Sequence, residues 1–233
     1  MFIPRLRYPA SALAGKHRLT GDDATVLRRR MFGHGLQSFD DAAQLIALNR
    51  SCPEATRDWN GWFVETIAGF VVGHVDAQGG LDDASARFLL DLWADGVISH
   101  PAELELLLHA MELAGDVPET VTVLALEQLQ RALQTGSGAY ARLRLAKRAG
   151  ISQIDTDYLY RILRRSVQGG KVVLHPGEIA VIEAIDGLVR GESNHPAWPA
   201  LVKSMAVRDK QGRVSAEHWL TLQSPAVSTR AAA

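Results

Sequence analysis

A helix-start signature recurs along this chain and constrains its fold more than any other feature. In each copy an aliphatic residue precedes a Ser or Thr, and an acid follows within about one helical turn. The hydroxyl can cap the free amides at the start of a helix, and the acid is attracted to the positive end of the helix dipole. The chain is therefore predicted to be all-α and modular. The copies are Leu19-Thr20 with Asp23, Leu36 and Ser38 with Asp41, Ile98-Ser99 with Glu103, and Ile151-Ser152 with Asp155.

Apolar periodicity and chain breakers divide the sequence into about nine helices, which we expect to form a multi-helix bundle. Gly, Pro and short polar turns separate the periodic segments. Residues 171–174 form the one short run with strand-like character. The predicted helices cover residues 21–32, 39–48, 57–75, 82–94, 100–114, 118–133, 153–167, 176–189 and 196–207, with a further short helix near 215–222.

The breakers also predict how the chain is organised into units. Residues 1–19 contain Pro, Gly and Arg without a period, so we expect a flexible arm. Residues 20–134 form an N-terminal helical unit, and the Gly-containing basic stretch 135–150 is predicted to be a linker. A C-terminal helical unit follows over residues 151–208, and residues 209–233 are predicted to be a tail.

The two predicted helical units are related by an internal duplication, in which residues 151–208 align with residues 20–75. Residues 97–103 and 172–178 give a third, partial echo. Repeated helical units bury their faces on one another, so we expect a pseudo-symmetric protein with the helices of residues 76–133 packed between two related units. The aligned pairs are Leu27 with Leu159, Arg29 with Arg161, Asp41 with Glu178, Leu48 with Ile185, Asn49 with Asp186, and Trp59 with Trp198.

Composition indicates a soluble protein of the reducing cytoplasm, without a membrane partner. The single cysteine, Cys52, allows no internal disulfide and no multi-cysteine zinc site, and we expect it to be structural. The most apolar stretch, residues 63–75, contains Glu65 and His74 and is too short to span a bilayer. The first residues show no continuous apolar run of the kind that a signal peptide needs.

Charge is segregated along the chain although the net charge is only −1. Residues 1–30 carry +5, residues 31–139 carry −12, residues 140–171 carry +6, and the rest is balanced. One interpretation is that basic segments lie on an acidic body. The other is that an anion or a nucleic acid binds the second basic segment, although nucleic-acid binders usually have a larger basic excess. The candidate anion-binding residues are Arg142, Arg144, Lys147, Arg148, Arg164 and Arg165.

Acidic residues around the third predicted helix suggest a divalent-metal site as an alternative function. Glu65 and His74 lie nine residues apart on different helical faces. A metal shared with Asp76 would therefore need further ligands, which Asp82 and Asp83 could supply across the following loop. The simpler interpretation makes His74 and Asp76 a helix-end pair.

Residues 91–103 show a partial EF-hand spacing. Asp91 and Asp95 stand where ligands are expected, but Trp93 occupies another ligand position. Ala102 stands where the loop requires a bidentate Glu. An ordinary helix–turn–helix is therefore the better interpretation.

Several of these motifs resemble a family of bacterial helical proteins with the tellurite-resistance TerB-like fold. They are the Ser/Thr helix starts, the FVET segment after residues 59–62, the breaker before Gly79-Gly80, and the helix ELELLLHAMELA. The resemblance covers roughly residues 20–207. It implies an all-helical fold, metal binding through acidic residues and a place in stress-related assemblies.

The sequence predicts a non-enzymatic protein without a cofactor. It has no Walker loop, GxGxxG, HExxH or GxSxG motif. The leading hypothesis is an interaction or scaffold protein in a stress-associated role, which binds another protein through helical surfaces. Trp219 either docks on the body of the protein or anchors a partner. The alternatives are divalent-metal binding, and anion or nucleic-acid binding through residues 140–165.

Overall fold

The fold is all-α, as predicted. A computed structural model describes residues 6–73, 80–144, 149–168 and 171–216. This part of the chain contains eleven helices, nine of them at least seven residues long, and only short strands. The helices are α1 Ala10–Leu13, α2 Gly21–Arg30, α3 Phe39–Ser51, α4 Arg57–Gly73, α5 Asp83–Leu92, α6 Pro101–Leu113, α7 Glu119–Thr135, α8 Ala139–Leu143, α9 Gln153–Leu163, α10 Pro176–Val189 and α11 Ala197–Ser204.

The strands form two small sheets at the ends of helices. The first pairs two strands in parallel, and the second is antiparallel with β4 in the middle. The predicted strand-like run at residues 171–174 is β4. The strands are β1 Arg18–Leu19, β2 Glu54–Ala55, β3 Val167–Gln168, β4 Lys171–Leu174 and β5 Val214–Ala216.

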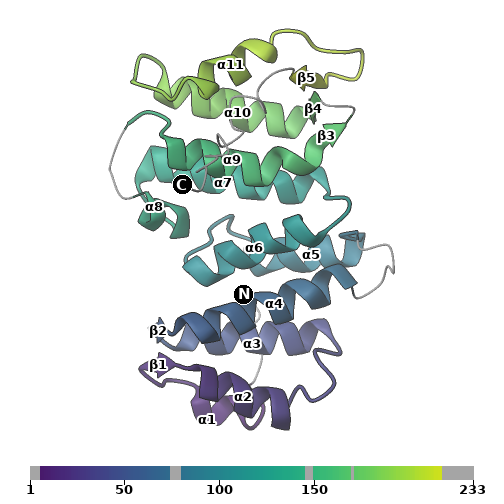
Figure 1. Ribbon diagram of the computed structural model, residues 1–233, viewed down its shortest axis with the longest axis vertical. Helices are drawn as coiled ribbons and strands as arrows, with labels where there is room; N and C mark the ends of the chain where they lie inside the picture. Colours follow the sequence, from purple (N-terminus) through teal and green to yellow (C-terminus); the bar gives the residue numbers. More distant parts are fainter. Residues whose placement is uncertain (1–5, 74–79, 145–148, 169–170, 217–233) are drawn as a thin grey trace, which may run out of the picture.

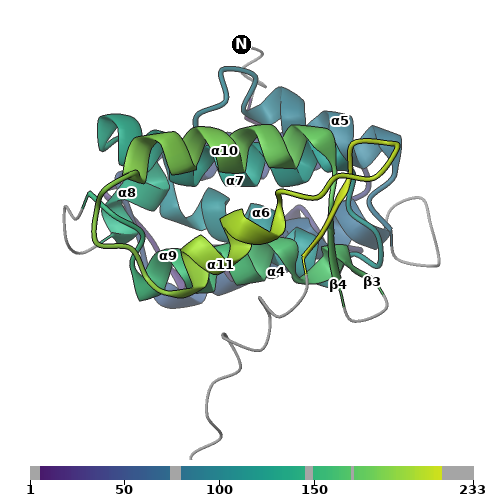
Figure 2. The same cartoon turned by 90° about the horizontal axis from the view of Figure 1, so that it is seen from above.

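Helix pairs are stacked along the long axis of the molecule (Figure 1). In order, the layers contain α1 with α2, α3 with α4, α5 with α6, α7 with α9, and α10 with α11. The helix α4 packs along α6, and α7 packs along α10. Viewed down the stack, α10 covers α7 (Figure 2). Each layer buries its apolar side chains against the next, as in other stacked helical proteins.

Two of the predicted helix starts form complete capping boxes. Thr20 and Asp23 form one at the start of α2, and Ser152 and Asp155 form the other at the start of α9. Both acids are enclosed, because Asp23 is 6% exposed and Asp155 is 0% exposed. Their carboxylates therefore do more than complement a helix dipole, since a buried charge must find partners.

The helices α6 and α10 begin in the same way as each other. In both, a His precedes a Pro, and the N-cap of α6 is His100 rather than the Ser99 of the signature. Both carry an acid at the third helical position, and Glu103 and Glu178 are each 1% exposed. Burial raises the pKa of Glu178, although a hydrogen bond from the His175 amide (2.8 Å) opposes that shift.

The prediction that residues 1–19 form a flexible arm is wrong for residues 6–19. This part contains α1 and β1, and Ala10 and Leu19 are 2% and 0% exposed. The Arg7 amide donates a hydrogen bond to Gln44 Oε1 on α3 (3.1 Å). The apolar residues of this segment are too scattered to show a period, but their burial fixes the segment on the body.

The prediction that residues 135–150 form a linker is wrong for residues 139–143, because these residues form α8. The Tyr140 side chain is buried, and its hydroxyl donates a hydrogen bond to Asp155 Oδ1 (2.9 Å). Its ring lies 4.0 Å from that of Tyr158, measured between centroids. Gly136 does end α7, with a positive φ of 65° that favours glycine.

Two boundaries in the C-terminal part also need correction. The helix predicted over residues 153–167 ends at Leu163, because a 3₁₀ turn and β3 follow it. Residues 214–216 form β5, paired with β4, where we predicted the start of a helix over 215–222. Residues 209–216 therefore belong to the C-terminal unit and not to the predicted tail at 209–233.

The aligned residues of the predicted duplication make the same contact in both units. The Trp59 indole N–H donates to Asn49 Oδ1 (3.0 Å), and the Trp198 indole N–H donates to Asp186 Oδ1 (3.1 Å). Both indoles are almost completely buried, at 0% and 1% exposure. In each unit a tryptophan thus holds the preceding long helix through one side-chain hydrogen bond.

We expect Trp59→Phe and Trp198→Phe to destabilise the protein by a similar amount, about 2 kcal/mol each. Each change leaves a polar acceptor without its donor and leaves a small cavity. The control is Trp62→Phe on α4, where the side chain is only partly buried and the expected loss is below about 1 kcal/mol. Urea unfolding measures the three losses. A Trp198→Phe protein as stable as the Trp62→Phe protein would contradict the shared role.

Candidate functional site

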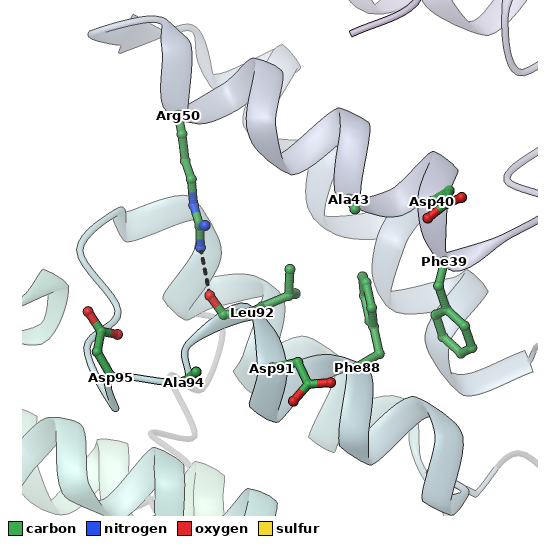
Figure 3. A pocket seen from close by; sticks show the side chains of 9 residues that line it. All are labelled: Phe39, Asp40, Ala43, Arg50, Phe88, Asp91, Leu92, Ala94 and Asp95. Carbon is green, nitrogen blue, oxygen red and sulfur yellow. Dashed lines mark hydrogen bonds between the residues drawn. The ribbon is translucent and has the colours of Figure 1, made fainter. Parts of the chain in front are cut away.

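A cavity of about 570 Å³ lies between α3 and α5, on one side of the helix stack (Figure 3). The layer of α3 and α4 meets the layer of α5 and α6 here. The helices α4 and α6 pack closely, whereas the cavity lies between α3 and α5. The lining comes from α3, from the C-terminal half of α5 and from the loop that follows. The lining residues are Phe39, Asp40, Ala43, Arg50, Phe88, Asp91, Leu92, Ala94 and Asp95.

The floor of the cavity is apolar and aromatic. The rings of Phe39 and Phe88 lie 4.8 Å apart between centroids, and Phe70 meets Phe39 edge-on at 5.4 Å. Phe39 and Phe88 are only partly buried, and both contribute to the lining of the cavity. Ala43 and Leu92 extend this apolar surface. The hollow therefore suits an apolar group, and an aromatic face also attracts cations.

Three exposed carboxylates stand around this floor. They belong to Asp40 on α3, Asp91 on α5 and Asp95 in the following loop (Figure 3). The Asp95 carboxylate also accepts a hydrogen bond from the Val97 amide (3.2 Å), which fixes the turn. Several carboxylates at the mouth of a low-dielectric hollow concentrate a negative potential there.

The cationic residue of the lining, Arg50, is engaged by a buried acid. Its Nε and Nη2 donate to the two carboxylate oxygens of Glu103 at 2.9 and 2.6 Å. Its Nη2 also donates to the Leu92 carbonyl (3.3 Å), which is the dashed contact in Figure 3. The Trp93 indole N–H donates to the same carboxylate (2.8 Å). This network joins α3, α5 and α6 at one end of the cavity and neutralises the Arg50 charge locally.

The predicted metal ligands are not brought together in the described residues. Glu65 lies on α4 with its side chain 69% exposed, 3.3 Å from His109 Nε2. Asp82 caps α5 through the Ser85 amide (2.7 Å), and Asp83 is exposed in the first turn. Within the described ranges, no group of three or more His, Cys, Asp or Glu side chains could hold a metal ion. The remaining two candidates, His74 and Asp76, lie outside these ranges.

The EF-hand interpretation of residues 91–103 does not fit the structure. Trp93 is 2% exposed, and Glu103 is occupied by Arg50 and Trp93. Cys52 is buried, and its sulfur lies 3.6 Å from the Leu13 carbonyl oxygen, as expected for a cysteine that packs inside the fold. The predicted partner anchor, Trp219, lies outside the described residues.

Three of the four candidate anion-binding residues that the structure describes contact the protein itself. Arg144 forms an ion pair with the buried Asp155, and its Nη2 donates a hydrogen bond to Asp155 Oδ2 (3.0 Å). Arg164 lies 3.9 Å from the carboxylate of Glu112, and Arg165 donates to the Glu112 carbonyl. These contacts remove donors that an anion would need.

The other candidates of this set do not form a cluster in the described residues. Arg142 is exposed on α8, and Lys147 and Arg148 lie outside the described ranges. The neighbouring Arg161 bonds Glu105 (2.7 Å) and Glu112 (2.8 Å) on α6. Residues 161–165 of the second basic segment thus contact Glu105 and Glu112 in the acidic part of the chain, as the first of the two interpretations of the charge pattern expects.

The α3–α5 cavity is the site that sequence reasoning missed. Apolar periodicity places Phe39 and Phe88 on apolar helix faces, but periodicity does not distinguish a core face from a face that lines a hollow. An acid follows each aromatic within one turn, Asp40 after Phe39 and Asp91 after Phe88. This pattern is not specific to a cavity, because Asp58 also stands beside the fully buried Trp59.

Comparison with known proteins finds no matching protein-family model, no matching curated protein and no matching solved structure. The TerB-like resemblance and the stress-associated role therefore stay predictions. Among the described helices, none has both the length and the apolar character that crossing a bilayer requires.

We expect Glu103→Gln to destabilise the protein by about 3 kcal/mol, because it leaves a partly buried Arg50 without its counter-charge. The matched control is Glu105→Gln on the same helix. The Glu105 side chain is 49% exposed and pairs with Arg161, so its loss should cost less than about 1 kcal/mol. Chemical denaturation measures both. Equal losses would show that the buried network does not hold α3, α5 and α6 together.

Proposed function

We propose that this protein is a non-enzymatic interaction protein that binds a partner protein at the α3–α5 cavity. The observation that carries the proposal is the combination of an open aromatic floor with three exposed carboxylates. Phe39 and Phe88 supply the floor, and Asp40, Asp91 and Asp95 supply the charge. Such a surface complements a partner residue with an apolar stem and a neighbouring positive charge.

The physical chemistry of protein interfaces supports this proposal. Binding energy concentrates where a side chain of one partner fills a pocket of the other, and the surrounding polar groups exclude water. Charges of opposite sign around that pocket accelerate encounter and select the partner. A cation over the Phe39 or Phe88 ring would add a further attraction.

The scaffold is also suited to display such a pocket. The buried bonds from Glu103 to Arg50 and to Trp93 fix the end of α5 relative to α3 and α6. The cavity walls are therefore held before a partner arrives, which reduces the entropy lost on binding. Stacked helical layers are a common way to present extended binding surfaces.

The test is an affinity purification from the native cells with tagged full-length protein, followed by mass spectrometry. We compare the wild type with a double charge reversal, Asp40→Lys with Asp91→Lys. The control reverses two exposed acids away from the cavity, Asp157→Lys with Glu192→Lys, so the change in net charge is the same. We expect the cavity variant to lose a stoichiometric partner that the wild type and the control retain.

Other outcomes contradict the proposal in distinguishable ways. A partner that all three proteins retain equally would place the interaction elsewhere on the surface. Co-purified nucleic acid that is released steeply by salt would support the anion-binding alternative instead. A divalent ion that raises the melting temperature of both the wild type and the cavity variant, and that a chelator removes, would support metal binding.

A further inference from the structure

A second hollow of about 410 Å³ lies on the other side of α5, against α7 and the start of α10. Its surface is apolar at Leu90, Val123 and Leu124 and acidic at Glu119 and Glu127. The lining residues are Leu90, Trp93, Ala94, Gly96, Glu119, Thr120, Val123, Leu124, Glu127 and Gly177.

The two hollows meet at Ala94, which lines both. Ala94 is exposed and follows the C-terminal end of α5. Asp91 and Leu92 line the hollow toward α3, whereas Leu90 and Trp93 line the hollow toward α7. The C-terminal end of α5 and the loop after it therefore contribute to both depressions, and we call the shared position the Ala94 saddle.

Both hollows carry the same charge. The first has carboxylates at Asp40, Asp91 and Asp95, and the second has them at Glu119 and Glu127. Glu119 is partly engaged, because its Oε1 accepts a hydrogen bond from the Gly177 amide (2.6 Å). An acidic surface with two apolar depressions thus runs across α3, α5 and α7.

Two cations lie near these carboxylates and offset part of their charge. Arg50 is bound to the buried Glu103. Arg131 lines neither hollow, but its Nη2 donates to the Gly96 carbonyl (3.5 Å), close to where Glu127 Oε2 approaches Gly96. The acidic excess of the surface therefore comes mainly from the three exposed carboxylates of Asp40, Asp91 and Asp95, because Glu119 and Glu127 are partly buried.

We infer that one continuous basic segment of the partner crosses both hollows, with an apolar anchor in each and cationic residues over the Ala94 saddle. This inference rests on the proposed function and adds the chemistry of the partner. A segment that joins two anchors makes the second contact intramolecular, so two modest pockets give one stable interaction. Oppositely charged neighbours fix the direction and register of the segment.

The test uses synthetic peptides as probes and fluorescence anisotropy as the readout. One peptide carries a Phe near each end with lysines and serines between them, in a series of spacer lengths. A second replaces one Phe by Ser, and a third replaces the lysines by glutamates. We expect the best two-anchor peptide to bind about tenfold or more tightly than the one-anchor peptide, because burying another Phe is worth at least that factor.

Protein variants assign each anchor to a hollow. Thr120→Trp with Glu127→Lys blocks the second hollow, and we expect it to remove the tenfold difference between the two peptides. Asp40→Lys with Asp91→Lys should weaken both peptides strongly. The surface control, Asp157→Lys with Glu192→Lys, should bind like the wild type, and the glutamate peptide should not bind.

Each contrary result has a distinct meaning. Equal affinity for the one- and two-anchor peptides, or no effect of the second-hollow variant, would overturn the single-segment inference while leaving the proposed function standing. The same holds if no peptide binds but the cellular partner still depends on Asp40 and Asp91. Self-association in analytical ultracentrifugation that the Asp40 and Asp91 reversals abolish would make a second copy the occupant and overturn the inference.

Discussion

A buried carboxylate at the third position of a helix is the contact on which the rest of this structure depends. Asp23 in α2 and Asp155 in α9 each bond the amide and hydroxyl of their own N-cap and also a cation, Lys16 or Arg144. Glu103 in α6 instead bonds Arg50 and the Trp93 indole. An enclosed charge without partners is costly, so each acid holds another segment in a defined place. Asp23 and Asp155 fix the chain just before their own helices, whereas the Glu103 network joins α6 to α3 and to the end of α5.

Charge segregation in the sequence has two different consequences in space. Some of the acidic residues form ion pairs with the basic segments. Glu112 pairs with Arg161, and Asp41 pairs with Arg7. Another part faces solvent around the α3–α5 cavity, where Asp40 and Asp91 accompany an aromatic floor. The same residue type therefore stabilises the fold at one place and shapes the candidate site at another. Exposed ion pairs contribute little to stability, so the buried acids dominate the first role.

The candidate site exists because neighbouring layers do not pack equally well along their length. α4 lies closely along α6, whereas α3 and α5 leave a cavity of about 570 Å³ in the same two layers. Arg50 and Glu103 close one end of this cavity, and Phe39 and Phe88 form its floor. Walls that are already fixed reduce the entropy that the binding proposed above would cost.

The sequence by itself determined the helical class and most helix positions, because capping and periodicity act over a few neighbouring residues. The equivalence of Trp59 with Trp198 was visible in the alignment. Only the tertiary structure decided that residues 6–19 and 139–143 pack on the body, and that residues 214–216 form a strand. The contact between Glu103 and Arg50, and the two hollows beside α5, were likewise decided only by the tertiary structure. These features depend on how layers distant in sequence approach each other, which no local pattern encodes.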